Sequence, residues 1–216
     1  MVVVIAVDAA ARARIETYLD EVERFNQRIN LTTVPRDQAW DRHIVDSLTL
    51  LEVAAPAAGE RVVDVGSGAG IPGIPFALVR PDLELTLVEA DRRRAGFLTH
   101  VAGLLSLSSV RVVSERAEAY GHAVEGREHF DLAVSRATAP PRVLCELTLP
   151  LVRVGGRLVA LVGSGSDPVA ASAQAARLCG GGDPTSPAPG VLAVVKERPT
   201  PTRLPRREGV PNRRPL

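Results

Sequence analysis

The sequence predicts an α/β fold of three layers, a mostly parallel sheet between two layers of helices, with a helical cap in front of it. Three observations favour this class. From Arg61 onwards, short valine-rich runs alternate with helical segments, as in proteins whose parallel strands are joined by helices. The first such unit, residues 62–73, reads V-V-D-V-G-S-G-A-G-I-P-G, which is a strand, a glycine turn and the start of a helix. Before Arg61 the periodic segments are helical only.

The composition is that of one α/β domain with a modest extension. The chain has 216 residues, of which 45% are hydrophobic and 24% charged, so it can bury a core and is not of the disordered class. Cys145 and Cys179 form no metal-ligand pattern and no disulfide framework, which favours a reducing cytoplasm and no metal. Residues 1–7 are apolar but too few to span a bilayer or to act as a signal, so we expect no membrane partner.

Residues 1–58 are predicted to form the helical cap. An amphipathic helix is expected over residues 8–29, and residues 30–33 followed by Pro35 end it. A second amphipathic helix is expected over residues 37–53, and residues 54–60 read as a linker of small residues.

Residues 59–198 are predicted to form the sheet domain. Strands are expected at residues 61–65, 83–89, 110–113, 131–135, 157–162 and 191–195, with helices at 71–79, 91–104, 116–120, 141–152 and 168–178. Residues 180–190 have the composition of a loop. In such a sheet a ligand binds at the carboxyl ends of the strands, where the strand order reverses.

Residues 199–216 are predicted to be a basic tail rich in proline and arginine. From Lys196, the only lysine of the chain, to Leu216 there are seven cationic residues and two acidic ones, although the whole chain has a net charge of only +1. A basic tail on a slightly acidic body is typical of a protein that meets an anionic partner at one place. A solvated tail without a partner is the alternative.

The glycine turn is predicted to bind a nucleotide or nucleoside. It follows a strand and precedes a helix, and Glu89 ends the next strand, where a carboxylate can accept hydrogen bonds from both ribose hydroxyls. The pattern G-x-G-x-G after Asp64 differs from the G-x-G-x-x-G of dinucleotide sites, and no Walker lysine follows it. This form resembles motif I of S-adenosylmethionine-dependent methyltransferases, so Gly66, Gly68 and Gly70 are candidate cofactor-binding residues.

Further stretches extend the likeness over most of the chain, from about Phe25 onwards. They are Asn30-Leu31-Thr32, residues 42–48 (R-H-I-V-D-S-L), residues 64–81, Ser135-Arg136-Ala137, and Pro205-Arg206-Arg207 with Gly209, Pro211 and Pro215-Leu216. In these the chain resembles the RsmG family (glucose-inhibited division protein B), bacterial methyltransferases of small-subunit ribosomal RNA. The resemblance implies a Rossmann-like S-adenosylmethionine-dependent enzyme that methylates N7 of a guanine in 16S rRNA of the small ribosomal subunit. A cytoplasmic monomer is expected.

The resemblance also implies roles for individual residues. Gly66 and Ile71 would contact the cofactor at the turn, Ala117 and Glu118 would hold the adenine, and Arg136 would line the site. Glu89 is assigned to the ribose independently, from its place at the end of a strand. For Glu118 an alternative is an acid that only stabilises a helix N-terminus.

The expected chemistry needs no general base, because guanine N7 carries a lone pair and no proton. We therefore assign no residue to acid–base catalysis and expect catalysis by positioning, with Asp46 and Arg136 as candidates. Asp46 could hold the donor edge of guanine. His43 lies one helical turn from Asp46, and the two side chains either contact RNA or merely join the cap to the sheet domain.

Basic residues outside the turn fall into two groups. Arg136, Arg206 and Arg207 are expected to bind RNA, the last two through phosphates without reading sequence. Residues 92–94, three consecutive arginines, are interpreted as a solvated helix face.

Three departures from the family pattern stand out. Phe25 replaces a usual tryptophan, Val162 lies near the place of a frequent lysine, and the region before Val191 leaves room for only one closing strand. Two other classes remain open at this point. One is a non-catalytic RNA-binding or ribosome-assembly factor with a methyltransferase fold, and the other is a nicotinamide-dependent oxidoreductase.

Overall fold

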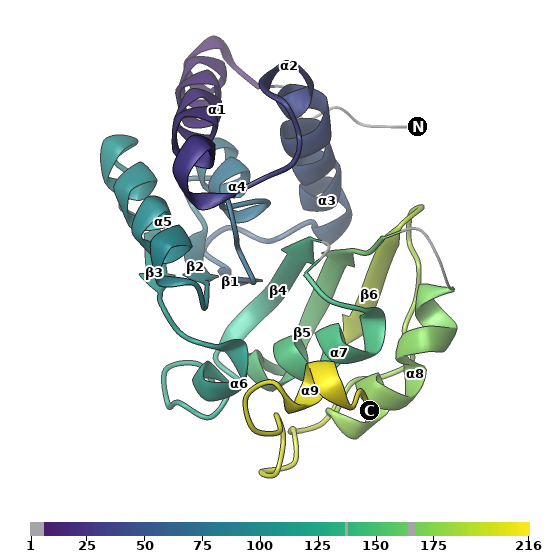
Figure 1. Cartoon of the computed structure of the whole chain (residues 1–216). Helices are drawn as coiled ribbons and strands as arrows, with labels where there is room; N and C mark the ends of the chain where they lie inside the picture. Colours follow the sequence, from purple (N-terminus) through teal and green to yellow (C-terminus); the bar gives the residue numbers. More distant parts are fainter. Residues whose placement is uncertain (1–6, 137, 164–166) are drawn as a thin grey trace.

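A six-stranded sheet lies between two layers of helices (Figure 1). The computed structural model describes residues 7–136, 138–163 and 167–216, so Ala137 and residues 1–6 of the predicted cap lie outside the described residues. The strands are β1 (Arg61–Val65), β2 (Glu84–Val88), β3 (Val110–Val113), β4 (Phe130–Arg136), β5 (Val152–Leu161) and β6 (Val191–Val195). Their order is β3-β2-β1-β4-β5-β6, with β6 antiparallel to β5 and all other pairs parallel. The predicted fold class is confirmed, and the order reverses between β1 and β4.

The N-terminal helices differ in one detail from those predicted. Helix α1 (Ala9–Ile29) is capped at its N-terminus by Asp8, whose side chain accepts a hydrogen bond from the Ala11 amide at 2.7 Å. The second predicted helix is divided into α2 (Arg36–Ala39), a π-helical stretch η1 (Trp40–Val45) and α3 (Asp46–Ala54). The wider turn of η1 carries His43 and Ile44, which are both fully buried. A continuous α-helix was therefore the wrong prediction for this segment, since periodicity does not reveal a π-turn.

The cap packs into the same layer as two helices of the sheet domain, α4 (Gly73–Val79) and α5 (Arg92–Leu104) (Figure 1). Tyr18 of α1, Ile44 of η1, Ile74 of α4 and Phe97 of α5 belong to one buried apolar cluster on this face of the sheet. Burying side chains of this size contributes about 1.5–3 kcal/mol each. The cap and the sheet domain thus share a hydrophobic core, although the cap precedes the sheet in sequence.

The other face of the sheet is covered by α7 (Pro141–Thr148), the 3-10 turn η2 (Leu149–Leu151) and α8 (Pro168–Leu178), with α6 (Ala117–Tyr120) at one side (Figure 1). The predicted basic tail packs on this layer and contains a short helix, α9 (Val210–Arg213). Leu204 is buried, and the guanidinium of Arg206 lies 2.5 Å from the carboxylate of the fully buried Glu146. We call residues 200–216 the C-terminal segment.

The edge of the sheet is more regular than the sequence indicates. β5 begins at Val152, five residues earlier than predicted, because the chain continues through Gly155 and Gly156 with a shift of register opposite Phe130 and Leu132. Within residues 180–190, predicted as a loop, Thr185 pairs with Ala193 and Gly181 pairs with Lys196 as isolated antiparallel bridges. The expected shortage of strands at this edge is thus partly compensated by these bridges.

Lys196 is fully buried at the end of β6. Its ammonium donates to the carbonyl oxygens of Leu149 at 2.5 Å and Val152 at 3.2 Å and to the hydroxyl of Thr200 at 2.6 Å, and it lies 3.2 Å from the carboxylate of Glu128. These contacts compensate the cost of burying the charge and join β6 to η2 and the C-terminal segment. No helix in the described part of the chain is long and apolar enough to cross a bilayer.

Candidate active site

The glycine turn lies at the carboxyl end of β1. Gly66, Gly68 and Gly70 all have positive φ angles, of 71°, 57° and 95°, which side-chain-bearing residues rarely adopt. A Cβ at Gly66 would also collide with the side chain of Thr138, whereas at Gly68 the nearest atom is 3.9 Å away. The turn is closed against β2, because the amides of Gly66 and Ser67 donate to the carbonyl oxygen of Val88. Gly66 therefore cannot carry a side chain beside Thr138.

Glu89 is fixed at the end of β2 by two backbone amides. Its carboxylate accepts hydrogen bonds from Gly68 and from Asp91, both at 2.8 Å, and the residue is only 6% exposed. The first of these bonds ties Glu89 to the glycine turn. The carboxylate is thereby held at the rim of the turn, with lone pairs left for further donors.

Glu118, in α6, faces the same region from the end of β3. It is 2% exposed, and one of its oxygens accepts from Arg116 at 3.0 Å and from the amide of Gly209 at 2.9 Å. Burial by itself would raise the pKa of Glu118, but the hydrogen bonds from Arg116 and Gly209 outweigh it and the net shift is downward. Glu118 is thus an anion that also anchors the C-terminal segment.

Arg136, at the end of β4, is held by the cap. Its guanidinium donates to the carbonyl oxygen of Arg42 and, at 2.9 Å, to Nδ1 of His43, and lies 3.7 Å from the carboxylate of Asp46. Burial, and then the charge of Arg136, lower the pKa of His43 to about 4, so its imidazole is neutral at physiological pH. Since Nδ1 accepts from Arg136, we assign the proton to Nε2, which lies 3.0 Å from the hydroxyl of Thr32.

Asp64 lies fully buried beneath the glycine turn. One carboxylate oxygen accepts from the amide of Gly73 at 3.1 Å, while the other has no hydrogen-bond partner among the described residues. Burial raises the pKa of Asp64 to about 7. The cap reaches the same turn through Tyr18, whose buried hydroxyl donates to the carbonyl oxygen of Ala69 at 2.8 Å.

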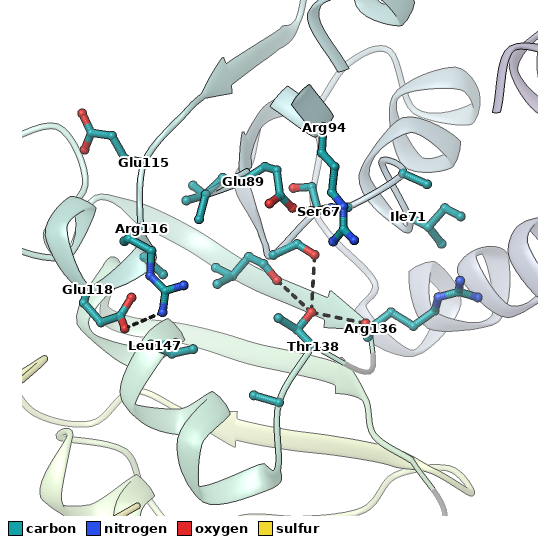
Figure 2. A pocket seen from close by; sticks show the side chains of 18 of the residues that line it. Ser67, Ile71, Glu89, Arg94, Glu115, Arg116, Glu118, Arg136, Thr138 and Leu147 are labelled. Atoms are coloured by element: carbon teal, nitrogen blue, oxygen red, sulfur yellow. Dashed lines mark hydrogen bonds and ion pairs between the residues drawn. The ribbon is translucent and has the colours of Figure 1, made fainter. Parts of the chain in front are cut away.

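The glycine turn, Glu89, Glu118 and Arg136 border a cleft of about 430 Å³ at the carboxyl ends of the strands (Figure 2). The predicted cofactor residues that line it are Gly66, Gly68, Ile71, Glu89, Ala117, Glu118 and Arg136, and Gly70 lies in the turn behind them. The volume is in the range of small-molecule sites. A polar rim of carboxylates and backbone, and a turn in which a Cβ would fill the space, fit a nucleoside-bearing cofactor.

The predicted RNA residues are distributed differently. His43 and Asp46 do lie together, on the outer side of Arg136, but do not line the cleft. Arg207 is exposed on the C-terminal segment, away from the cleft. Arg206 was expected to bind phosphate, yet its guanidinium makes two hydrogen bonds with Glu146, at 2.8 and 2.5 Å, so the structure gives it a different partner.

Sequence reasoning missed several residues of the cleft. Arg94 was interpreted as part of a solvated helix face, but its side chain lines the cleft; Leu31 and Thr32 of the cap, Thr138 after β4 and Asn212 of α9 also line it. A signal existed for Arg94, because it is in the first turn of the helix that follows Glu89. For Asn212 no local signal exists, since it approaches from the far end of the chain. Among the described residues no group of three or more His, Cys, Asp or Glu could hold a metal ion.

A family model for rRNA small subunit methyltransferase G (GidB) matches residues 11–182. The chain belongs to this family. It is 38% identical over 215 residues to ribosomal RNA small subunit methyltransferase G of Moorella thermoacetica, covering 94% of this chain and 90% of the relative. It is 41% identical over 216 residues to the protein of the same name from Chloroflexus aggregans, with the same two coverages.

Solved structures show the same fold at low identity. One is a 16S rRNA N2 G1207 methyltransferase from T. thermophilus in complex with AdoMet and guanosine, with a TM-score of 0.50 and 21% identity over 70% of this chain and 39% of that one. Another is a mutant of MtNAS in complex with S-adenosylmethionine, with a TM-score of 0.54 and 16% identity over 88% and 76% of the two chains. These likenesses bear on the fold alone.

Family membership confirms the resemblance predicted from the sequence and the class of enzyme, an S-adenosylmethionine-dependent methyltransferase of 16S rRNA. The non-catalytic factor and the oxidoreductase are not favoured. The assignment of individual residues to cofactor binding and RNA binding stays a prediction.

Proposed function

We propose that this chain methylates N7 of a guanine in the 16S rRNA of the small ribosomal subunit, and that the cleft at the carboxyl ends of β1–β4 holds S-adenosylmethionine beside that guanine. The observation that carries the proposal is the cleft's combination of the glycine turn with the Glu89 carboxylate at its rim. When bound, the cofactor supplies an electrophilic methyl group on a sulfonium centre.

We assign the cofactor's parts to the cleft by the chemistry of its walls. Glu89 offers free lone pairs to two ribose hydroxyls. Ala117 and Glu118 stand beyond Glu89, where the backbone of α6 and an anionic carboxylate suit the adenine. Gly66, Gly68 and Ile71 then border the methionine part, since the two glycines add no side chain to this end of the cleft.

The chain's residues act by positioning rather than by proton transfer. Guanine N7 has no proton to remove, and Arg136, whose guanidinium stays charged, cannot serve as a base. Arg136 is held by His43 and by the carbonyl oxygen of Arg42, so it presents a fixed cationic edge where cap and cleft meet. Asp46, about half exposed beside it, can accept from the N1–H and amino group of a guanine. These contacts orient the base and help to exclude water.

RNA outside the reacting guanine is proposed to meet polar groups beside the cleft and on the C-terminal segment. Arg136 and Asp46 face it from the cap side, with the buried His43 acting only through Arg136. Arg207, exposed on the C-terminal segment, is proposed to bind a phosphate, a contact that needs no sequence readout. The enzyme is further proposed to act as a monomer in the cytoplasm.

The test is transfer of labelled methyl from S-adenosylmethionine to small ribosomal subunits from cells lacking this protein, with the modified base identified. We expect one labelled 7-methylguanine per particle, and no labelling of subunits from cells that contain the protein. As a matched control, Glu84→Gln, at the exposed far end of β2, should label normally, while Glu89→Gln should not. Binding of S-adenosylmethionine without transfer to any rRNA would contradict the proposal and favour the non-catalytic factor.

A further inference from the structure

Arg94 differs from the other arginines of the cleft in having no carboxylate partner. Three arginines line the cleft. Arg116 lies 3.0 Å from Glu118, and Arg136 lies 3.7 Å from Asp46 and donates to two other acceptors of the cap. The guanidinium of Arg94 donates to the neutral carbonyl oxygen of Asn30 at 3.1 Å, and no carboxylate of the described residues lies within 4.0 Å of it.

The side chain of Arg94 points into the cleft. Arg94 is the third residue of α5, and Asp91 caps this helix by accepting from the amides of Arg93 and Arg94. Figure 2 shows its guanidinium reaching from α5 towards Ser67 and Ile71, on the opposite side of the cleft from Arg116 and Glu118. One amino group is fixed by Asn30, and the remaining N–H groups of the fork are available to an anion.

The charges of the proposed cofactor identify that anion. S-adenosylmethionine carries a sulfonium and an ammonium, which a guanidinium repels, and a single anionic group, the carboxylate of its methionine part. Of the three carboxylates that line the cleft, Glu89 accepts from two amides, Glu118 accepts from Arg116 and Gly209, and Glu115 is exposed at the far side of the cleft from Arg94 (Figure 2). The unmatched cation is therefore at the turn end of the cleft, where the methionine part is proposed to lie.

We propose that Arg94 binds the carboxylate of the cofactor's methionine part. This rests on the proposed function, because it uses the cofactor placement given there. A phosphate of the RNA is the competing ligand, and the structure favours the carboxylate for a geometric reason. Arg94 is half-buried and attached to Asn30, while the next two residues of the cap, Leu31 and Thr32, line the same cleft, so the guanidinium lies under the cap rather than on the open surface.

The experiment compares two ligands that differ by that one group, S-adenosylmethionine and decarboxylated S-adenosylmethionine. Dissociation constants are measured by calorimetry, without RNA, for the wild type, Arg94→Gln and Arg94→Lys. We expect Arg94→Gln to weaken binding of S-adenosylmethionine about tenfold, as for loss of a charge-assisted hydrogen bond at a half-exposed site. Binding of the decarboxylated ligand should be unchanged or tighter, since the variant lacks a cation that repels this ligand's positive charges. Arg94→Lys should recover part of the loss.

Arg93→Gln is the matched control, because it removes the same charge from the neighbouring, exposed position of the same helix and should alter neither constant. If Arg94→Gln weakened the binding of both ligands equally, the proposal would be overturned, and the role of Arg94 would be only to join α5 to Asn30. Unchanged constants with a raised KM for ribosomal subunits would overturn it in favour of an RNA phosphate. Failure of methyl transfer in the wild type would instead contradict the proposed function, and the two binding constants would still be measurable.

Discussion

The two sides of the cleft are built in different ways. One side, which we call the sheet wall, consists of residues 66–71, 89–90 and 117–118, and Glu89 there is held by Gly68 and Asp91, 21 and 2 positions away. The other side, which we call the cover, consists of Leu31, Thr32, Arg136 and Asn212, together with the residues that support them, 33–46 and 209–211. In the cover, Arg136 bonds to His43 across 93 positions and Gly209 bonds to Glu118 across 91. The wall is thus held mostly by contacts within neighbouring strand–turn–helix units, with Tyr18 of the cap as an exception, whereas the cover is held by contacts between distant parts of the chain.

The largest expected effect tests whether the sheet wall binds the cofactor independently of the cover. Gly66→Arg places a side chain at a φ of 71° and into the side chain of Thr138, so we expect loss of cofactor affinity by about a hundredfold or more. RNA binding, which we propose to depend on the cover, should survive. Calorimetry with S-adenosylmethionine and a filter assay with small subunits measure the two.

The control for that variant is Gly163→Arg, where a Cβ meets nothing within 4 Å and φ is not positive. It should leave both affinities unchanged. If Gly66→Arg lost RNA binding to the same extent as cofactor binding while remaining folded by circular dichroism, the division into wall and cover would be wrong.

The next effect concerns how the cover is anchored. Arg206→Gln leaves the fully buried carboxylate of Glu146 without its cation, and we expect a loss of about 2–3 kcal/mol in the free energy of unfolding, less than for a wholly buried pair because Arg206 is partly exposed. Urea denaturation measures it. Arg207→Gln, one residue on and exposed, should not change stability but should reduce the salt dependence of RNA binding by about one unit of slope. Equal stability of the two variants would show that the segment is not anchored there.

A smaller effect separates substrate from cofactor within the cover. His43→Asn removes an acceptor that orients Arg136, so we expect the KM for small subunits to rise about tenfold while the dissociation constant of S-adenosylmethionine is unchanged. Because the pKa of His43 is lowered to about 4, the wild-type KM should show no titration of this residue between pH 6 and 8. His100→Asn, paired with Glu21 far from the cleft, is the control. A matching loss of cofactor affinity would mean that His43 supports the wall as well.

The smallest effect is a pH dependence beneath the wall. The pKa of Asp64 is raised to about 7, above its value of about 3.9 in an unfolded chain, so the folded protein binds more protons between these pH values. Stability from this group is present at low pH and is lost as the pH rises through 7. Asp64→Asn removes this loss, so its melting temperature relative to wild type should rise by a few degrees from pH 5 to pH 8. A difference that is independent of pH would show that Asp64 does not titrate in this range.

The sheet wall and the cover also differ in how much of their structure could be predicted from the sequence. The strands, the mostly parallel character of the sheet and the glycine turn with Glu89 could be derived from residue patterns, because periodicity and turn chemistry act over a few positions. The bounds of β5 were missed, since Gly155 and Gly156 read as a break but are accommodated by a shift of register. The π-helical stretch η1 was missed because its apolar spacing is that of an ordinary helix.

The cover could be predicted only incompletely. The resemblance pointed to Arg136, and guanine chemistry and helical spacing pointed to Asp46 and His43, but none of them showed that the neutral imidazole accepts from the guanidinium. The basic charge of the tail pointed to Arg206 as a phosphate ligand, whereas its guanidinium is paired with Glu146, a buried acid on α7 that no sequence pattern links to residue 206. Arg94 was missed for the opposite reason. Three consecutive arginines indicated a solvated helix face, but the side chain of Arg94 points into the cleft.

The chemical reactivity of Lys196 can report local unfolding at the end of β6. It carries the only side-chain amine of the chain, and that amine is enclosed by Leu149, Val152 and Thr200. An amine-reactive reagent can therefore acylate a side chain only while β6 is detached from η2 and the C-terminal segment. The acylation rate at Lys196, followed by mass spectrometry, measures the free energy of that local opening without any engineered label.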